Sequence, residues 1–380
     1  MNSKERVKAA IERKAVDKIP LGFYVVDHDT IAKVIGRPTY VRNKPAQQIA
    51  FWEGRRDEVI ESMKEDITDF YKKIDCVDLL TFKEIYPIPP RGYKTEDPPR
   101  KVDDTTYEDE KGNVYKVSFE SNRIALVHDA ERPKELPTYS EEMFADRTLP
   151  DEPDPTCFEL LDHLIETFGQ DRYIATHSAG TTAVTLLGGM ERGFMTMALQ
   201  PEVIKACNRQ KVFQQNYLDQ FYIRAGADGV LMEQDFAGTK GPFISPDMFR
   251  ELAFPFLRQR IENAKKYLSR VIFHCCGNTL LLMDMLLEAG IDAYESIQTG
   301  AEISIDILAE RYGNRLCIWG AIPLEVLISG TPEDTRKAVR ENIESGKKAP
   351  GFILGPSHSI AFGTKYDNFM AMLDEFNKLR

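Results

Sequence analysis

The sequence predicts a (β/α)8 barrel on the basis of two observations. Eight apolar segments of strand length occur along the 380 residues, and nearly all of them are followed by a segment with helical periodicity. Eight such units are the number that closes a barrel of parallel strands. A doubly wound sheet is the second choice, because no Gly-x-Gly-x-x-Gly follows the first strand.

The first two strands lie in the N-terminal quarter of the chain. An amphipathic helix is expected over residues 3–16, and a strand that is apolar on both faces follows at 19–26. A long helical region at 45–73 leads to the second strand at 76–82. Strands that are apolar on both faces are typical of parallel sheets, in which helices cover the outer surface.

Residues 84–155 differ in composition and are expected to form an insertion within a single domain that spans residues 1–380. The stretch 86–103 is rich in proline and charged residues, which indicates an irregular loop. Alternating polarity over 105–119, around a Lys-Gly-Asn turn, predicts a β-hairpin, and 124–128 is expected to add a strand. The barrel is therefore predicted to carry a β-hairpin insertion after its second strand.

From residue 156 onward strands and helices alternate regularly. The six further strands are expected at 173–176, 229–232, 271–273, 292–296, 316–320 and 352–354. The helices are expected at 157–168, 190–198, 201–224, 246–268, 279–288, 304–312, 332–346 and 367–379. These six strands complete the count of eight.

Composition restricts the class of protein. Hydrophobic residues make up 42% and charged residues 29%, which is ordinary for a soluble globular protein. The formal net charge of −11 disfavours nucleic acid and anionic membranes as partners, because both need a basic face. The sequence shows no membrane-spanning stretch and no signal peptide, and its six cysteines are scattered. We therefore expect a cytoplasmic protein with reduced cysteines.

Polar side chains collect where the predicted strands end. Four of the six histidines end a strand or follow one directly. Because the active sites of such barrels lie at the carboxyl ends of the strands, these side chains are expected to meet in one cavity. The set comprises Asp27, His28, His177, Glu233, Asp235, His274, Cys276, Glu295 and His358.

The segment His274-Cys275-Cys276, at the end of a predicted strand, contains half of a metal site. Successive side chains of a strand point to opposite faces, so His274 and Cys276 share a face and Cys275 points away. A converging imidazole and thiolate are typical of zinc sites, and a catalytic zinc has three protein ligands and one open position. The candidates for the third ligand are His358, Glu233 and Asp235.

Several of these residues also have a purely structural interpretation. His177 could bond to the backbone of a tight turn, and Glu233 and Asp235 could pair with basic residues. For His274 and Cys276 the alternative is a hydrogen-bonded histidine beside a buried cysteine. Their spacing on one strand face favours the metal site.

Three features together resemble the uroporphyrinogen decarboxylase superfamily. They are the eight-unit order, the His-x-Cys-Gly at 274–277 and the segment Leu-Gly-Pro-Ser-His-Ser-Ile at 354–360. The Thr-Pro-Glu-Asp at 331–334 is similar to the penultimate βα unit of that superfamily. The resemblance covers nearly the whole chain, and it implies a barrel with its site at the mouth.

Two branches of the superfamily differ after the first strand. The decarboxylases carry an Arg-Gln-Ala-Gly-Arg motif there, which grips the carboxylates of the porphyrinogen, whereas residues 23–29 of this chain contain no arginine. The corrinoid-dependent methyltransferases carry His-x-Cys and a distant cysteine, and they bind zinc. This chain has His358 in place of the distant cysteine, which argues against activation of a thiol.

The hairpin insertion and the His-Cys-Cys-Gly-Asn segment are most similar to the methyltransferases that demethylate methoxylated aromatic compounds. This resemblance implies that a methyl group passes from the ether oxygen of a small substrate to cob(I)alamin on a separate corrinoid protein. The alternatives are a methylcobalamin:thiol methyltransferase and a uroporphyrinogen decarboxylase. A homodimer is compatible with each of these functions.

The resemblance and the expected chemistry together suggest a role for each candidate residue. Zinc is expected on His274, Cys276 and His358, where it would stabilise charge on the ether oxygen. Glu233 is an alternative ligand or an acid, and His177 and Asp235 would orient the substrate or the ligands. A slot for the aromatic ring is expected from Phe23, Tyr24, Phe236 and Phe243, which could equally belong to the core.

Overall fold

The computed structural model describes residues 1–85, 87–133 and 137–380, and its centre is a closed barrel of parallel strands. In spatial order the strands are β1 (Gly22–Phe23), β2 (Leu79–Leu80), β7 (Tyr173–His177), β8 (Gly229–Glu233), β11 (Val271–His274), β12 (Ala293–Glu295), β13 (Cys317–Ile322) and β14 (Phe352–Pro356). Leu21 pairs with Leu354, whose N–H donates to the carbonyl of Pro20, so β14 lies beside β1. The predicted (β/α)8 barrel is confirmed.

The first two strands are much shorter than the predicted spans 19–26 and 76–82, since β1 and β2 pair over two residues each. Pro20 has no N–H to donate to a ladder. The N–H of Leu21 donates instead to the side chain of Asp78, at 3.0 Å. A buried carboxylate thus replaces part of the ladder on this side of the barrel.

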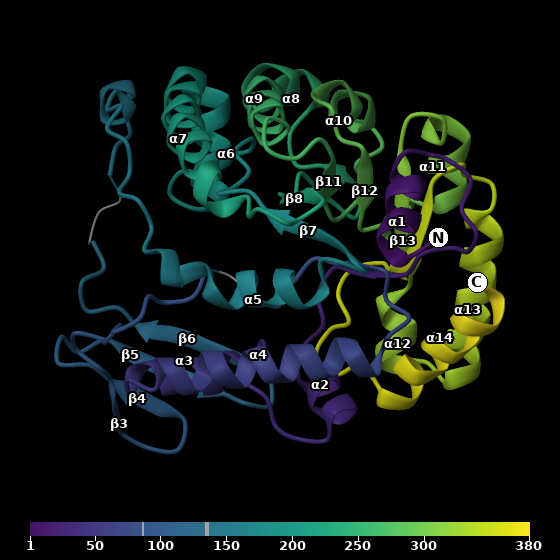
Figure 1. Cartoon of the computed structure of the whole chain (residues 1–380). Helices are drawn as coiled ribbons and strands as arrows, with labels where there is room; N and C mark the ends of the chain where they lie inside the picture. Colours follow the sequence, from purple (N-terminus) through teal and green to yellow (C-terminus); the bar gives the residue numbers. More distant parts are fainter. Residues whose placement is uncertain (86, 134–136) are drawn as a thin grey trace.

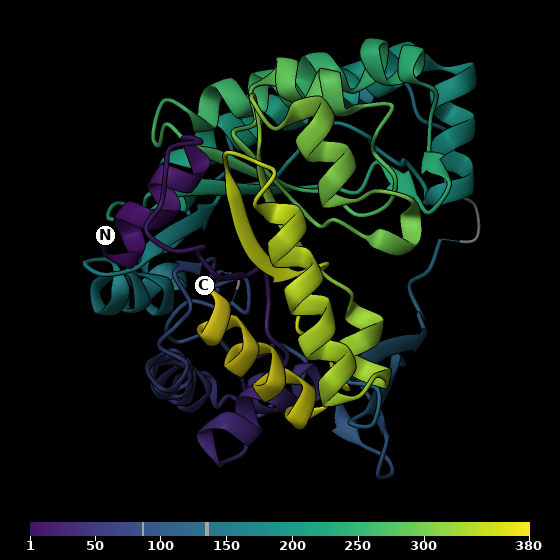
Figure 2. The ribbon, with the colours of Figure 1, turned by 90° about the vertical axis from the view of Figure 1, so that its right-hand side faces the viewer.

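Helices surround the barrel (Figure 1). They are α1 (Ser3–Ile11), α2 (His28–Ile35), α3 (Lys44–Trp52), α4 (Arg56–Lys73), α5 (Glu159–Phe168), α6 (Met190–Leu199), α7 (Pro201–Tyr222), α8 (Pro246–Leu252), α9 (Phe254–Ala264), α10 (Met283–Ala289), α11 (Ile305–Tyr312), α12 (Leu324–Ser329), α13 (Pro332–Gly346) and α14 (Tyr366–Leu379). Figure 2 shows β14 beside α1. None of the described helices is long and apolar enough to cross a membrane.

Two long predicted helices are each interrupted. The expected helix 45–73 is divided into α3 and α4, and the expected helix 246–268 is divided at Ala253 into α8 and α9. Pro255 stands at the start of α9, where its missing N–H costs nothing, whereas inside one continuous helix it would remove a hydrogen bond. Helix α2, which begins at His28, was not expected from the sequence.

Strand alternation divides the core into two layers. One face of each strand packs inside the barrel, where Tyr173, Leu231, Ile272 and Trp319 belong to one buried cluster. The other face packs against the surrounding helices and forms the larger buried cluster, which includes Phe273. On β11 this alternation turns Ile272 and His274 inward and Phe273 outward.

A four-stranded antiparallel sheet lies between β2 and β7 in the chain, as Figure 1 shows at the side of α3. Its strands are β3 (Arg100–Lys101), β4 (Thr106–Glu108), β5 (Val114–Ser118) and β6 (Arg123–His128). Trp52 of α3 packs against Tyr107 and Tyr115, with ring centroids 5.2 and 5.3 Å apart. The predicted hairpin and added strand are confirmed. Positions 86 and 134–136 of the predicted insertion lie outside the described residues, and the single domain stays a prediction.

Candidate metal centre and adjoining cavity

The strand ends bring the predicted site residues together at the barrel mouth. His274 ends β11, and its neighbours across the two adjoining ladders are Glu233 at the end of β8 and Glu295 at the end of β12. His177 ends β7, the next strand beyond β8. Residues more than a hundred positions apart in the sequence therefore share one end of the barrel, as the fold class predicts.

His274, Cys276 and His358 form a cluster with the geometry of a metal site. One ring nitrogen of each histidine and the sulfur of Cys276 all lie within 4.8 Å of one another. The Sγ of Cys276 is 3.5 Å from Nε2 of His274 and 3.3 Å from Oγ of Ser296. Within the described ranges this is the one group of three or more His, Cys, Asp or Glu side chains that meets that criterion.

Glu295 orients His274 for a ligand role. This carboxylate is fully buried, and it accepts the Nδ1–H of His274. Burial lowers the pKa of His274, but the charge and hydrogen bond of Glu295 together with those of Cys276 outweigh it and raise the pKa to about 10. Because Nδ1 donates to Glu295, Nε2 on the Cys276 side is the nitrogen that can hold a metal. A metal that binds there must displace the proton of Nε2. A carboxylate behind a metal-binding histidine is a common supporting arrangement.

The other two cluster members also fit a metal. Burial raises the pKa of the Cys276 thiol, but hydrogen bonds with His274 and His358 outweigh it and lower the pKa to about 7. The thiolate, which is the form that binds zinc, is therefore accessible near neutral pH. Nδ1 of His358 is engaged by the N–H of Ser359 at 2.7 Å and its hydroxyl at 2.9 Å, which favours Nε2 as the ligand atom.

Tyr24 covers the cluster. Its ring stacks on His274 with centroids 3.9 Å apart and an interplanar angle of 6°, and it meets His358 edge-on at 5.6 Å. Its hydroxyl donates a hydrogen bond to Glu233. Tyr24 was expected to line a slot for a substrate ring, whereas its observed contacts are with the candidate metal ligands and with the carboxylate beside them.

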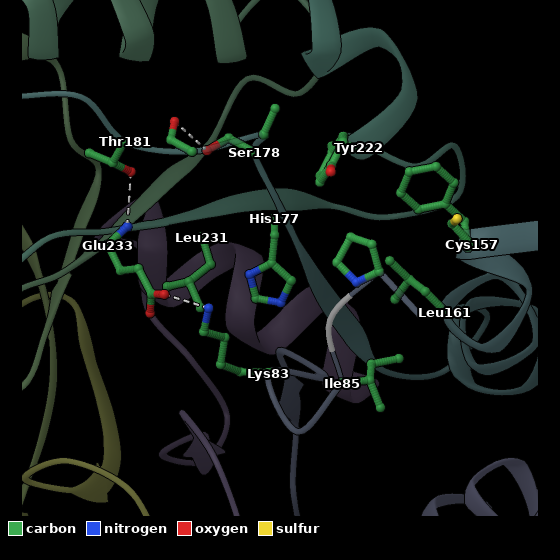
Figure 3. A pocket seen from close by; sticks show the side chains of 14 residues that line it. Lys83, Ile85, Cys157, Leu161, His177, Ser178, Thr181, Tyr222, Leu231 and Glu233 are labelled. Carbon is green, nitrogen blue, oxygen red and sulfur yellow. Dashed lines mark hydrogen bonds and ion pairs between the residues drawn. The ribbon is translucent and has the colours of Figure 1, made fainter. Parts of the chain in front are cut away.

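A cavity of about 310 Å³ opens between the ends of β2, β7 and β8 and the start of α5 (Figure 3). The three cluster residues do not line it, but Glu233 does, and Glu233 neighbours His274 across the β8–β11 ladder. Such a volume is at the lower end of the range for small-molecule sites. Its apolar wall consists of Ile85, Pro87, Cys157, Phe158, Leu161, Tyr222 and Leu231. Its polar lining includes Lys83, His177, Ser178, Thr181 and Glu233.

Glu233 links the cavity to the metal cluster. One of its carboxylate oxygens accepts a hydrogen bond from Tyr24, and the other pairs with Nζ of Lys83. Burial raises the pKa of Glu233, but the charge and hydrogen bond of Lys83 outweigh it, and the pKa falls below its ordinary value. Glu233 is therefore ionised at neutral pH, which does not fit its predicted role as an acid, and it stands outside the three-residue cluster.

His177 is a neutral member of the cavity lining. Its Nε2 lies 3.0 Å from the carbonyl oxygen of Thr81, which can only accept, so Nε2 carries the proton and Nδ1 is an acceptor. Burial, helped by the charge of Lys83, lowers the pKa of His177 to about 4. His177 thus bonds to backbone that follows β2 and not to the tight turn after its own strand, and its ring borders the cavity (Figure 3).

A buried ion pair holds the loop that follows His177. Arg260 and Asp219 are both fully buried and pair at 2.7 Å. Arg260 also donates twice to the carbonyl of Gly180, at 3.0 and 2.9 Å, and Asp219 accepts the N–H of Ala179 at 3.0 Å. The loop that lines the cavity is thus fixed from α7 and α9.

The remaining predicted residues have structural contacts. Asp235 accepts the N–H of Cys276 at 2.9 Å and so positions that ligand through its backbone. Phe23 and Phe236 are fully buried and pack against core rings, and neither borders the cavity, so the predicted slot is wrong for both. Phe243 is partly exposed and packs against Phe194.

Asp27 and His28, which follow β1, are held by contacts within the fold. Asp27 is 7% exposed, and it pairs with Arg42 at 2.6 Å and accepts the N–H of Phe362 at 2.8 Å. His28 stacks on Phe362 with centroids 5.2 Å apart. These contacts tie the start of α2 to the loop after β14, which carries His358.

The sequence profile described as uroporphyrinogen decarboxylase (URO-D) matches residues 132–379, well over half of the chain. The chain belongs to the URO-D family. The predicted superfamily is thereby confirmed. The match contains all three cluster residues of this URO-D protein, whereas Tyr24 and Lys83 precede it.

Curated relatives of this URO-D protein are methyltransferases by name. The methylcobamide:CoM methyltransferase MtbA of Methanosarcina acetivorans is 22% identical over 152 residues, which is 40% of this chain and 42% of the relative. The methylated-thiol–coenzyme M methyltransferase of Methanosarcina mazei is 28% identical over 129 residues, which is 34% of this chain and 32% of the relative. The aligned segments thus span less than half the length of these relatives.

A solved structure of a methyltransferase from Methanosarcina mazei superimposes on the whole URO-D chain. The TM-score is 0.61 at 15% sequence identity, and the superposition covers 100% of this chain and 99% of the other. At this identity the superposition shows a shared fold.

Proposed function

We propose that this URO-D protein is a zinc-dependent methyltransferase that moves a methyl group from a methoxylated aromatic substrate to cob(I)alamin on a partner corrinoid protein. The proposal is carried by the cluster of His274, Cys276 and His358 beside a cavity with an apolar wall. Two nitrogens and one sulfur suit zinc. Three protein ligands leave one position open, as in catalytic zinc sites.

A zinc ion held by this cluster would supply Lewis acidity for the oxygen from which the methyl group departs. The side chains perform the other tasks. The apolar wall packs against the aromatic ring and excludes water, and Nδ1 of His177 can accept a hydrogen bond from a ring hydroxyl. Tyr24 shields His274, while Asp235 and Glu295 hold Cys276 and His274 in place. The nucleophile comes from the partner, so no nucleophilic side chain is needed.

The test replaces Cys276 by alanine. The Cys276→Ala protein is expected to lose zinc and methyl transfer together, because two remaining ligands hold a metal poorly. Zinc per chain is measured by plasma emission, and methyl transfer by the visible absorbance of methylcobalamin formed from cob(I)alamin and a methoxylated arene. Cys275→Ala is the matched control, since Cys275 is buried and accepts the N–H of Phe236 instead. Unchanged zinc in Cys276→Ala would reject the metal assignment.

A methylcobalamin:thiol methyltransferase is the second candidate, because two relatives carry names of that kind. His358 argues against it, since the resemblance places a second zinc-binding thiolate, as the third ligand, at that position in thiol-activating enzymes. Purified protein given methylcobalamin and a thiol would distinguish the two. If methylcobalamin is consumed in that mixture faster than it is formed from cob(I)alamin and a methoxylated arene, the second candidate is favoured.

Uroporphyrinogen decarboxylation, the activity in the family's name, is the least supported of the three. A porphyrinogen with eight carboxylates needs several cations around it. Among the described residues that line the cavity, Lys83 is the one lysine or arginine, and it is paired with Glu233. Metal-independent release of carbon dioxide from a porphyrinogen would be the signature of this activity.

A further inference from the structure

The cavity contains one positive and one negative side chain, and they neutralise each other. Lys83 and Glu233 are the charged residues among the described lining, since His177 is neutral. The Lys83 side chain is 8% exposed and its Nζ lies against Oε1 of Glu233. The side chains that line the cavity therefore carry no net charge between them, and most of them are apolar.

Glu233 is itself held in place from three sides. Its second carboxylate oxygen accepts the hydroxyl of Tyr24, whose ring is stacked on His274. Its backbone N–H donates to Oγ1 of Thr181 at 3.2 Å, as Figure 3 shows. These contacts restrict the Glu233 side chain to one position. An anion that binds to Lys83 must therefore lie next to a fixed negative charge.

We propose that Glu233 determines which substrates the cavity accepts by cancelling the charge of Lys83. The inference rests on the proposed function and narrows its substrate class to uncharged methoxyarenes, such as methoxyphenols. Rings that carry a carboxylate are rejected, because the carboxylate would lose its hydration and meet like charge at Glu233. A phenolic hydroxyl meets no such obstacle, since Nδ1 of His177 and the hydroxyl of Ser178 can bond to it.

Removing the charge of Glu233 should abolish or reverse the preference for uncharged rings over carboxylated ones. Glu233→Gln keeps an oxygen to accept from Lys83 and an amide to reach Tyr24, so the fold and the stacking on His274 are expected to persist. The positive charge of Lys83 is then no longer cancelled by Glu233. A charge-assisted hydrogen bond of this kind strengthens binding of the carboxylate by roughly ten- to hundredfold.

The experiment compares guaiacol, a neutral methoxyphenol, with vanillate, its ring-carboxylated counterpart, by titration calorimetry at pH 7.5 with zinc-loaded protein and no corrinoid. The wild type is expected to bind guaiacol at least about tenfold more tightly than vanillate. Glu233→Gln should bind vanillate roughly ten- to hundredfold more tightly than the wild type does, with guaiacol little changed. The double variant Lys83→Met/Glu233→Gln is the matched control and should lose that gain.

Each other outcome overturns the inference. If the wild type binds vanillate as tightly as guaiacol, or if the gain in Glu233→Gln survives removal of Lys83, the charge of this pair does not select the substrate. The proposed function still stands in that case, provided that guaiacol yields methylcobalamin when cob(I)alamin is supplied. If the wild type binds neither compound and transfers no methyl group, the aromatic substrate of the proposed function fails as well.

Discussion

Replacing Arg260 by methionine tests how the cavity loop is held. Arg260 and Asp219 are both fully buried, so the substitution leaves a carboxylate in the interior without its counter-charge. It also removes both hydrogen bonds to the carbonyl of Gly180, which borders the cavity. We expect a large loss of stability and a loosened cavity wall, with the metal cluster on β11 and after β14 unaffected.

The expected size follows from the burial of the pair. Removing one partner of a buried ion pair costs about 3–5 kcal/mol in the free energy of unfolding, because the remaining charge is uncompensated. A second change, Asp219→Asn, removes that charge and keeps an oxygen for the N–H of Ala179, so it should recover a substantial part of the loss. The exposed pair of Arg250 with Glu288 provides the matched control, and Arg250→Met should cost about 1 kcal/mol or less.

Urea unfolding followed by far-ultraviolet circular dichroism gives the free energies for these variants. Zinc content and calorimetric binding of guaiacol are measured on the same samples under folding conditions. Arg260→Met should retain zinc and bind guaiacol more weakly than the wild type. A loss of stability no larger than that of Arg250→Met would refute the view that the buried pair supports the loop.

Two further predictions concern buried carboxylates. Glu295→Gln should weaken zinc binding by roughly ten- to hundredfold in a chelator competition, because the charge behind Nδ1 of His274 is lost; equal affinity would contradict this. Burial raises the pKa of Glu84 from 4.5 to about 7, so the wild type loses stability as pH rises through that interval. The free energy of unfolding of Glu84→Gln minus that of the wild type should therefore rise by up to roughly 3 kcal/mol between pH 4.5 and pH 9, as measured by urea unfolding. A difference between the two proteins that does not change with pH would exclude this.

The fold was predictable because its signals are local. The sequence pattern of each strand–helix unit is contained within about 30 residues, and eight such units form one closed barrel of parallel strands. The His274–Cys276 pair was predictable for the same reason, since alternation along one strand brings the two side chains to one face. His358 followed from its position after the last strand, once the barrel brought that strand near β11.

Two of the errors could have been avoided from the sequence, whereas the pairing that gives Lys83 its significance could not. Phe23 and Tyr24 are neighbours in the predicted strand 19–26 and cannot both point inward, so alternation alone would have assigned Phe23 to the core. Lys83 was missed although it directly follows the predicted strand 76–82, where the same strand-end rule would have found it. Its significance arises from pairing with Glu233, which lies 150 residues further along the chain and which no local pattern connects to it.

The barrel wall is uneven, and this has a consequence for which parts of the site can change independently of one another. The candidate ligands come from β11 and from the loop after β14, within the part of the chain that matches the family. Tyr24 and Lys83 follow the two-residue strands β1 and β2, outside that match. The three candidate ligands thus lie within the part of the chain that matches the family profile, whereas the proposed selectivity pair is divided, with Lys83 before the match and Glu233 inside it. Substitutions near β1 and β2 are therefore expected to change one side of the cavity lining while all three candidate ligands are kept.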